Sequence, residues 1–215
     1  MKKLSGLDAA FLYLETETSP MQIGGVSILE SHTPDGPLTL EGLKDLLRSR
    51  IHMSRTFTER LEEVPLGLSR PYWIEDPDFD LDRHVERTQL PEPGGFRELS
   101  ALVTWEMSRL LPRDRPLWHL LLVEGLGEIE HIKPGSVALI SRIHHAAIDG
   151  MSGTEIMRAL YDPTPRPAPA AEKPRPRAAA TAPSKLALLT GRGAAKDEEE
   201  SGAGLGNLVR GALGG

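Results

Sequence analysis

The 215-residue sequence contains no cysteine. This absence excludes disulfide-stabilised scaffolds, cysteine nucleophiles, thiolate zinc sites and cysteine-ligated iron–sulfur clusters, and it favours the cytosol while leaving the compartment open. Asp8 precedes any apolar run at the N-terminus, so we expect neither a signal peptide nor a transit peptide. No apolar stretch approaches the length that is needed to span a bilayer.

The sequence also lacks an excess of positive charge. Its formal net charge is −6 and its pI is near 5.7. Nucleic-acid-binding surfaces normally need Lys and Arg in clustered excess on one face. We therefore expect no nucleic-acid partner, which leaves small-molecule chemistry or protein partners.

The composition changes after residue 162. Residues 163–215 include 12 Ala, 8 Gly and 7 Pro, and none of these 53 residues is aromatic. Such a segment cannot bury enough apolar surface to form a core. We predict one folded unit over residues 1–162 and a linker or disordered tail over residues 163–215, with a weak helical segment at 184–189.

The folded unit has the patterns of mixed helix and strand. Ser5 and Asp8 form a helix start signal, and apolar residues at helical spacing predict amphipathic helices over residues 39–53 and 96–110. A Ser-x-x-Glu capping box at Ser152 predicts a further helix.

Several short apolar segments read as strands. Residues 22–29 contain paired glycines, Gly24 and Gly25, which allow close backbone approach or a bulge. Two segments, 117–126 and 136–143, lack polar residues at alternate positions, as expected for strands that are buried on both faces. Weaker strand candidates are residues 71–74 and 85–90.

The second buried strand leads into His144-His145-x-x-x-Asp149-Gly150 at a strand-to-helix turn. Adjacent strand residues point to opposite faces, so both imidazoles cannot face one small cavity unless the chain turns between them. For this reason, and because no His-Glu-x-x-His is present, we expect no metal site. Two interpretations remain: one imidazole acts as a general base near neutral pH, or both histidines are structural.

The motif from His144 to Gly150 resembles that of the bacterial wax ester synthase/diacylglycerol acyltransferase family, which belongs to the coenzyme A-dependent acyltransferase superfamily. The motif alone is also similar to that of peptide-synthetase condensation domains. Residues 4–11, residues 20–25 and Pro116-Leu117-Trp118 look like the lipid acyltransferases at corresponding places. Gln22 departs from the histidine that is expected beside Pro20-Met21.

The resemblance implies a fold of two chloramphenicol-acetyltransferase-like lobes, each an α/β (α+β) sandwich, with this chain forming one lobe. It implies that His145 is the general base, that His144 supports it, and that Asp149 and Gly150 hold the turn. Residues Pro116, Leu117 and Trp118 are expected to line or brace the substrate tunnel, although a buried strand start with Trp118 in the core is the stronger interpretation. Acyl-CoA is implied as a co-substrate, without a bound cofactor.

The implied reaction is O-acyl transfer from acyl-CoA to diacylglycerol or a long-chain alcohol. It would take place in the cytoplasm, with peripheral contact at the inner membrane face or lipid droplets, and with a separate C-terminal lobe or a second copy as partner. One alternative is a non-catalytic lobe that binds lipid or a partner. Another, weaker alternative is a condensation-type domain that forms amide bonds.

Overall fold

The computed structural model describes residues 1–30, 32–33, 36–127, 129–148, 152–162, 184 and 188. Within these residues the helices are α1 (Gly6–Leu14), α2 (Leu40–Arg50), α3 (Phe96–Ser108) and α4 (Ser152–Leu160). The strands are β1 (Lys2–Lys3), β2 (Gln22–Leu29), β3 (His32–Thr33), β4 (Gly36–Pro37), β5 (Glu59–Glu62), β6 (Tyr72–Glu75), β7 (Val85–Gln89), β8 (Trp118–Glu124) and β9 (Val137–His144). Short 3-10 turns are η1 (Ile51–Met53), η2 (Arg55–Phe57), η3 (Pro65–Gly67), η4 (Leu81–Arg83) and η5 (His145–Ala147).

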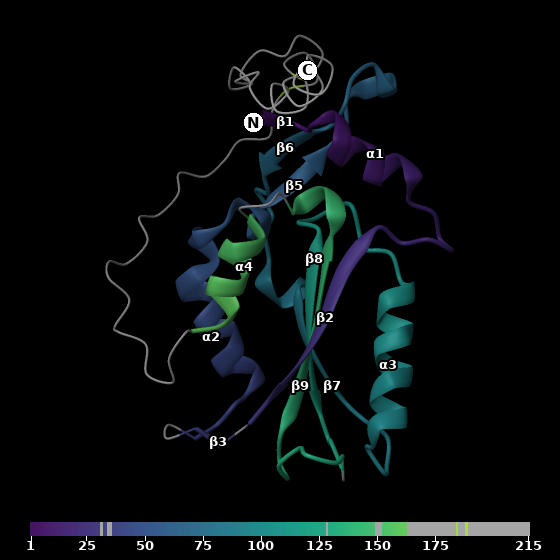
Figure 1. Ribbon diagram of the computed structural model, residues 1–215. Helices are drawn as coiled ribbons and strands as arrows, with labels where there is room; N and C mark the ends of the chain where they lie inside the picture. Colours follow the sequence, from purple (N-terminus) through teal and green to yellow (C-terminus); the bar gives the residue numbers. More distant parts are fainter. Residues whose placement is uncertain are drawn as a thin grey trace, which may run out of the picture.

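The central sheet has the order β2-β9-β8-β7, with β2, β9 and β8 antiparallel and β7 parallel to β8. Helices α2 and α4 cover one face and α3 covers the other (Figure 1). On β8, Leu120 and Leu122 face α2 and α4, while Leu121 and Val123 face α3. Both faces of β8 and β9 are thus buried, which confirms the prediction from their unbroken apolar runs.

A smaller sheet of order β1-β6-β5 lies at one end of the central sheet, next to α1 (Figure 1). Tyr72 and Ile74 of β6, together with Val64 after β5, pack with Leu188, which is 2% exposed. The sequence did not predict β1 or β5, because β1 is a Lys pair and β5 reads Glu-Arg-Leu-Glu, so neither shows an apolar pattern. Apart from Ser184 and Leu188, the predicted tail over residues 163–215 lies outside the described residues.

Local chemistry explains where the predicted elements begin and end. Helix α1 starts at the predicted signal, because the Ser5 hydroxyl accepts a hydrogen bond from the Asp8 amide at 3.1 Å. Strand β8 ends at Glu124 rather than at residue 126, since Gly125 adopts a left-handed φ of 76°. Helix α3 ends at Ser108, two residues earlier than predicted, because Arg109 is already extended.

The glycines of β2 serve close approach rather than a bulge. The register of β2 against β9 is continuous from Gln22 to Leu29. At Gly24 the Met107 side chain of α3 occupies the space that a Cβ atom would need. The close packing of α3 on this strand therefore depends on the missing side chain. No helix among the described residues is long and apolar enough to cross a membrane.

Candidate active site

The chain turns between the two histidines of the motif. His144 is the last residue of β9, and its amide donates to the Leu117 carbonyl at 2.9 Å. His145 begins η5, and its amide donates to the Met21 carbonyl at 2.8 Å. The two imidazoles therefore lie in different surroundings. Asp149 and Gly150, which the sequence analysis placed at this turn, lie outside the described residues.

His144 is a buried imidazole with a defined tautomer. Its Nδ1 accepts a hydrogen bond from the Ala146 amide at 3.0 Å, so the proton of the neutral ring is on Nε2. That Nε2 lies 3.2 Å from Glu15 Oε1, and the side chain is 1% exposed. Burial lowers the pKa of His144 from its ordinary value, although the nearby Glu15 carboxylate opposes this shift. His144 thus has the surroundings of a neutral, structural residue.

Glu15 is a site residue that the sequence analysis did not identify. Its carboxylate is 3% exposed and accepts hydrogen bonds from the Met21 amide at 3.1 Å and from Arg113 at 3.0 Å. Glu15 contacts His144 directly, and it contacts His145 through Met21, whose carbonyl accepts a hydrogen bond from the His145 amide. One buried carboxylate therefore supports both histidines. It stands in a polar stretch just after α1, where no periodicity marks it.

His145 has a different environment. Its ring is partly exposed and stacks on Phe11 of α1, with centroids 4.4 Å apart and an interplanar angle of 14°. None of the hydrogen bonds found among the described residues involves its ring nitrogens. The stacking fixes the plane of the ring and leaves the nitrogen atoms available to a substrate. Among the two histidines, His145 is the one that can exchange a proton with a bound molecule.

Pro116, Leu117 and Trp118 are buried in the structure. The Trp118 indole donates to the Phe57 carbonyl at 3.1 Å and stacks on His84 with a centroid separation of 4.4 Å. The Leu117 carbonyl holds the His144 amide. These residues therefore brace the strand that ends at the histidines, and a lining role in a tunnel stays a prediction.

Gln22 has a structural role in this chain. Its Nε2 donates to the Met107 carbonyl at 2.8 Å and to the Arg109 carbonyl at 3.1 Å, at the C-terminus of α3. Arg142, two residues before His144, donates to the carbonyls of Glu106 and Arg109. Together these contacts satisfy carbonyl groups that a helix end leaves unpaired, and they attach α3 to the sheet beside the histidines.

Solved structures first define the class of fold. The first condensation domain of the calcium-dependent antibiotic synthetase matches with a TM-score of 0.56 at 20% identity, over 74% of this chain and 36% of that chain. The starter condensation domain of rhizomide synthetase, solved in complex with C8-CoA, matches with a TM-score of 0.56 at 14% identity, over 74% of this chain and 35% of that chain. At these identities the similarity establishes the fold alone, which is that of the coenzyme A-dependent acyltransferases and condensation domains.

Sequence similarity then identifies the family. The model of the wax ester synthase/diacylglycerol acyltransferase catalytic domain matches residues 4–212, and the chain belongs to this family. A putative diacylglycerol O-acyltransferase of Mycobacterium tuberculosis is 40% identical over 166 residues, which are 77% of this chain and 34% of that protein. The wax ester synthase/diacylglycerol acyltransferase from Marinobacter aquaeolei VT8 has a TM-score of 0.57 at 34% identity, over 72% of this chain and 37% of that structure. The matched part spans about a third of the length of these two relatives.

Proposed function

We propose that this chain carries the proton-transfer half of an acyl-CoA-dependent O-acyltransferase, whose acceptor is diacylglycerol or a long-chain alcohol. The proposal rests on the different surroundings of the two histidine rings. The ring of His144 is buried and contacts the Ala146 amide and the Glu15 carboxylate. The ring nitrogens of His145 form no hydrogen bond within the part of the chain that the structure describes. Family membership supplies the reaction class.

In the proposed step, a ring nitrogen of His145 takes the proton of the acceptor hydroxyl as the hydroxyl oxygen attacks the thioester carbonyl. The resulting tetrahedral oxyanion collapses with cleavage of the carbon–sulfur bond. The leaving thiolate takes the proton back from the imidazolium, so the products are the ester and free CoA thiol. His144 and Glu15 position the turn, and Asp149 is proposed to help hold it.

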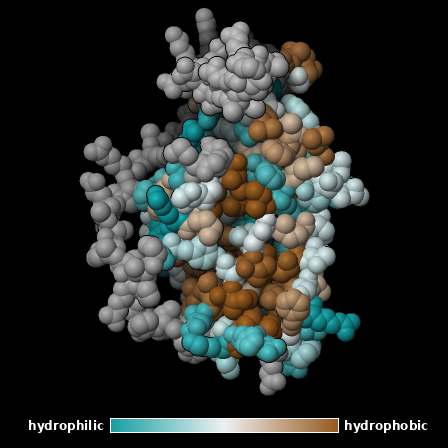
Figure 2. All heavy atoms as spheres, viewed as in Figure 1, coloured by the Kyte–Doolittle hydropathy of each residue, from teal (hydrophilic) through white to brown (hydrophobic). Residues whose placement is uncertain are grey.

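A second lobe is part of this proposal, because the relatives are longer than this chain. Strand β2 forms an edge of the central sheet, and its Ile23, Val26 and Ile28 are each at least 40% exposed. Apolar residues gather along the visible face of the molecule (Figure 2). This surface suits a C-terminal lobe or a second copy as partner. We place the reaction in the cytoplasm at a membrane face or lipid droplet, since both acceptors are apolar.

The test is acceptor-dependent release of CoA thiol from palmitoyl-CoA, measured with a thiol-reactive dye. The chain has no cysteine, so every thiol that is detected comes from CoA. We expect His145→Ala to lower the rate at least about 100-fold, as loss of a general base does. The matched control is His131→Ala, because the His131 side chain is 89% exposed on a loop. The assay is run on the chain alone and again with the separately expressed C-terminal part of a relative added. A folded wild-type chain without acceptor-dependent release in both cases would contradict the proposal and favour a binding role.

A further inference from the structure

The turn between β5 and β6 exposes two leucines to solvent. It contains η3, in which Leu66 is 92% exposed, and then Leu68, which is 69% exposed. Figure 1 shows the turn extending beyond the two strands at the upper end of the molecule, and Figure 2 shows hydrophobic atoms at its tip. No other large apolar side chain in the described part of the chain is as exposed as that of Leu66.

The backbone holds Leu66 in this position against its conformational preference. Its φ of 62° lies in the left-handed region, which a leucine rarely adopts. The Gly67 amide donates to the Val64 carbonyl at 3.0 Å, and the Val64 side chain is buried at the base of the turn. Asparagine or glycine would adopt this conformation at lower cost. A leucine that is kept here and directed to solvent points to a contact made by its side chain.

Helix α1 continues the apolar surface. The Arg70 guanidinium, just after the turn, lies against Gly6, the first residue of α1. On this helix Leu7 is 72% exposed and Leu14 is 63% exposed, two helical turns apart on one face, while the opposite face packs in the core. A surface helix is apolar on one face, and a helix that is apolar on opposite faces is buried on both. The outer face of α1 has no such cover among the described residues.

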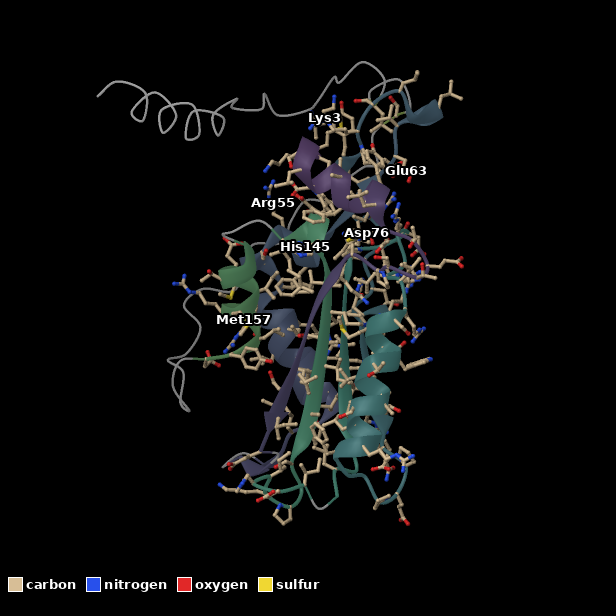
Figure 3. The ribbon with its side chains drawn as sticks, turned by 45° about the vertical axis from the view of Figure 1, so that its right-hand side comes forward. Lys3, Arg55, Glu63, Asp76, His145 and Met157 are labelled. Atoms are coloured by element: carbon tan, nitrogen blue, oxygen red, sulfur yellow. The ribbon has the colours of Figure 1, made fainter. Side chains whose placement is uncertain are left out.

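Unpaired cations surround these leucines. The two lysines of β1 and Arg70 form no ion pair with any residue that the structure describes. Of the two carboxylates before the turn, Glu62 pairs with Arg60 at 2.9 Å, and Glu63 is exposed. Figure 3 shows Lys3 and Glu63 at the same end of the molecule, beyond His145. Free positive charge thus exceeds free negative charge at this end, although the chain has a net charge of −6.

The form of this surface favours a lipid layer over a protein partner. A stable protein interface uses about 20–30 residues on each side, packed against a complementary shape. Here four leucines project from a turn and a helix, and projecting side chains enter fluid hydrocarbon without needing a matching pocket. The neighbouring cations complement the phosphate groups at the surface of such a layer.

We propose that Leu66, Leu68, Leu7 and Leu14 form a lipid-contact surface that inserts into the outer part of a phospholipid layer. The lysines of β1 and Arg70 then lie at the level of the phosphates. Phe11 of the same helix stacks on His145, with ring centroids 4.4 Å apart. Helix α1 would therefore touch the lipid with one face and the histidine with another. The inference rests on the proposed function only for its consequence, that an apolar acceptor reaches His145 along α1.

The test is co-sedimentation of the full chain with vesicles of phosphatidylcholine, alone or mixed with phosphatidylglycerol. The variant Leu66→Asn/Leu68→Ser should bind both kinds of vesicle at least about 10-fold more weakly, because two apolar side chains no longer leave water. Asn tolerates the left-handed backbone at position 66, so this variant should fold. Phe96→Ser is the matched control, since Phe96 is 72% exposed at the start of α3 and should not affect binding.

The cations should act separately from the leucines. Phosphatidylglycerol should strengthen binding by about 10-fold, because anionic lipid attracts cations near the surface. The variant Lys2→Ala/Lys3→Ala should lose this gain and keep its binding to phosphatidylcholine.

Several results would overturn the inference. These are the absence of vesicle binding by the folded chain, equal binding by the double leucine variant, and an equal loss in Phe96→Ser. A wild-type dimer that the leucine variant does not form, without vesicle binding, would overturn it in favour of a protein partner. Vesicle binding without thiol release would refute only the proposed reaction. Thiol release without vesicle binding would refute only the lipid-contact surface.

Discussion

Two buried glutamates next to the histidines should differ in their contribution to stability. The carboxylates of Glu106 and Glu15 are both 3% exposed, but their cationic partners differ. Arg142, 2.9 Å from Glu106, is 4% exposed, whereas Arg113 beside Glu15 is 40% exposed. In Glu106→Gln a buried guanidinium loses its counter-charge, while in Glu15→Gln the guanidinium can turn to water.

Removing one partner of a buried ion pair costs about 3–5 kcal/mol. For Glu106→Gln we expect a loss of stability near the lower limit of this range, because Arg142 keeps its hydrogen bonds to the carbonyls of Glu106 and Arg109. For Glu15→Gln we expect about 1.5 kcal/mol, the value for a hydrogen bond to a charged group whose partner stays solvated. With a slope of about 2 kcal/mol per molar urea, the midpoints should fall by about 1.5 M and about 0.75 M.

Urea unfolding followed by circular dichroism measures both changes. Glu130→Gln is the matched control, since the Glu130 side chain is 87% exposed. This substitution should shift the urea midpoint by less than about 0.25 M. Combining Glu106→Gln with Arg142→Met should cost less than the sum of the single changes, because the uncompensated charge is gone. Equal midpoints for the two glutamate variants would refute the argument from partner exposure.

Two further predictions concern acid and packing. Burial lowers the pKa of His84 from 6.5 to about 4. As the pH falls below 6.5, the unfolded chain therefore takes up a proton on His84 before the folded chain does. The free energy of unfolding should fall by about 3 kcal/mol between pH 6.5 and pH 4. His84→Leu should flatten this part of the stability profile at the cost of the hydrogen bond to the Trp118 carbonyl, and an unchanged acid slope would contradict it. In Gly24→Ala the new methyl group would contact the flexible Met107 side chain, so the free energy of unfolding should fall by about 1 kcal/mol. In Gly127→Ala it would contact the Pro93 backbone, so the loss should be about 3 kcal/mol. Scanning calorimetry measures both losses, and the reverse order would contradict the argument.

The parts of the fold that could be predicted are those with a local pattern. The helices α2 and α3 show apolar residues at helical spacing, and β8 and β9 show unbroken apolar runs, so their existence followed from the sequence. Gly125 and the extended Arg109 shifted the ends of β8 and α3 by two residues. Helix α2 ends at Arg50 rather than at residue 53, because residues Ile51–Met53 form a 3-10 turn. Strands β1 and β5 exist through pairing with β6 and carry no apolar pattern of their own.

The candidate site was predictable to the same extent. The motif located both histidines, and the condition that the chain must turn between them is met at the junction of β9 and η5. Glu15 could not be predicted, because only the pairing of β2 with β9 brings it to His144. The tautomer of His144 likewise depends on the Ala146 amide, whose direction is a property of the turn. Contacts between distant segments therefore account for what the sequence did not reveal.

The pairing of β2 with β9 has a consequence for biosynthesis. The two strands meet through residues 116 positions apart, such as Gly25 and Ser141. At elongation rates of about 5–20 residues per second, the ribosome synthesises β9 on the order of 10 s after β2. During that interval the backbone N–H and C=O groups of β2 have no neighbouring strand to pair with. The yield of folded chain should therefore depend on how the growing polypeptide is protected on the ribosome.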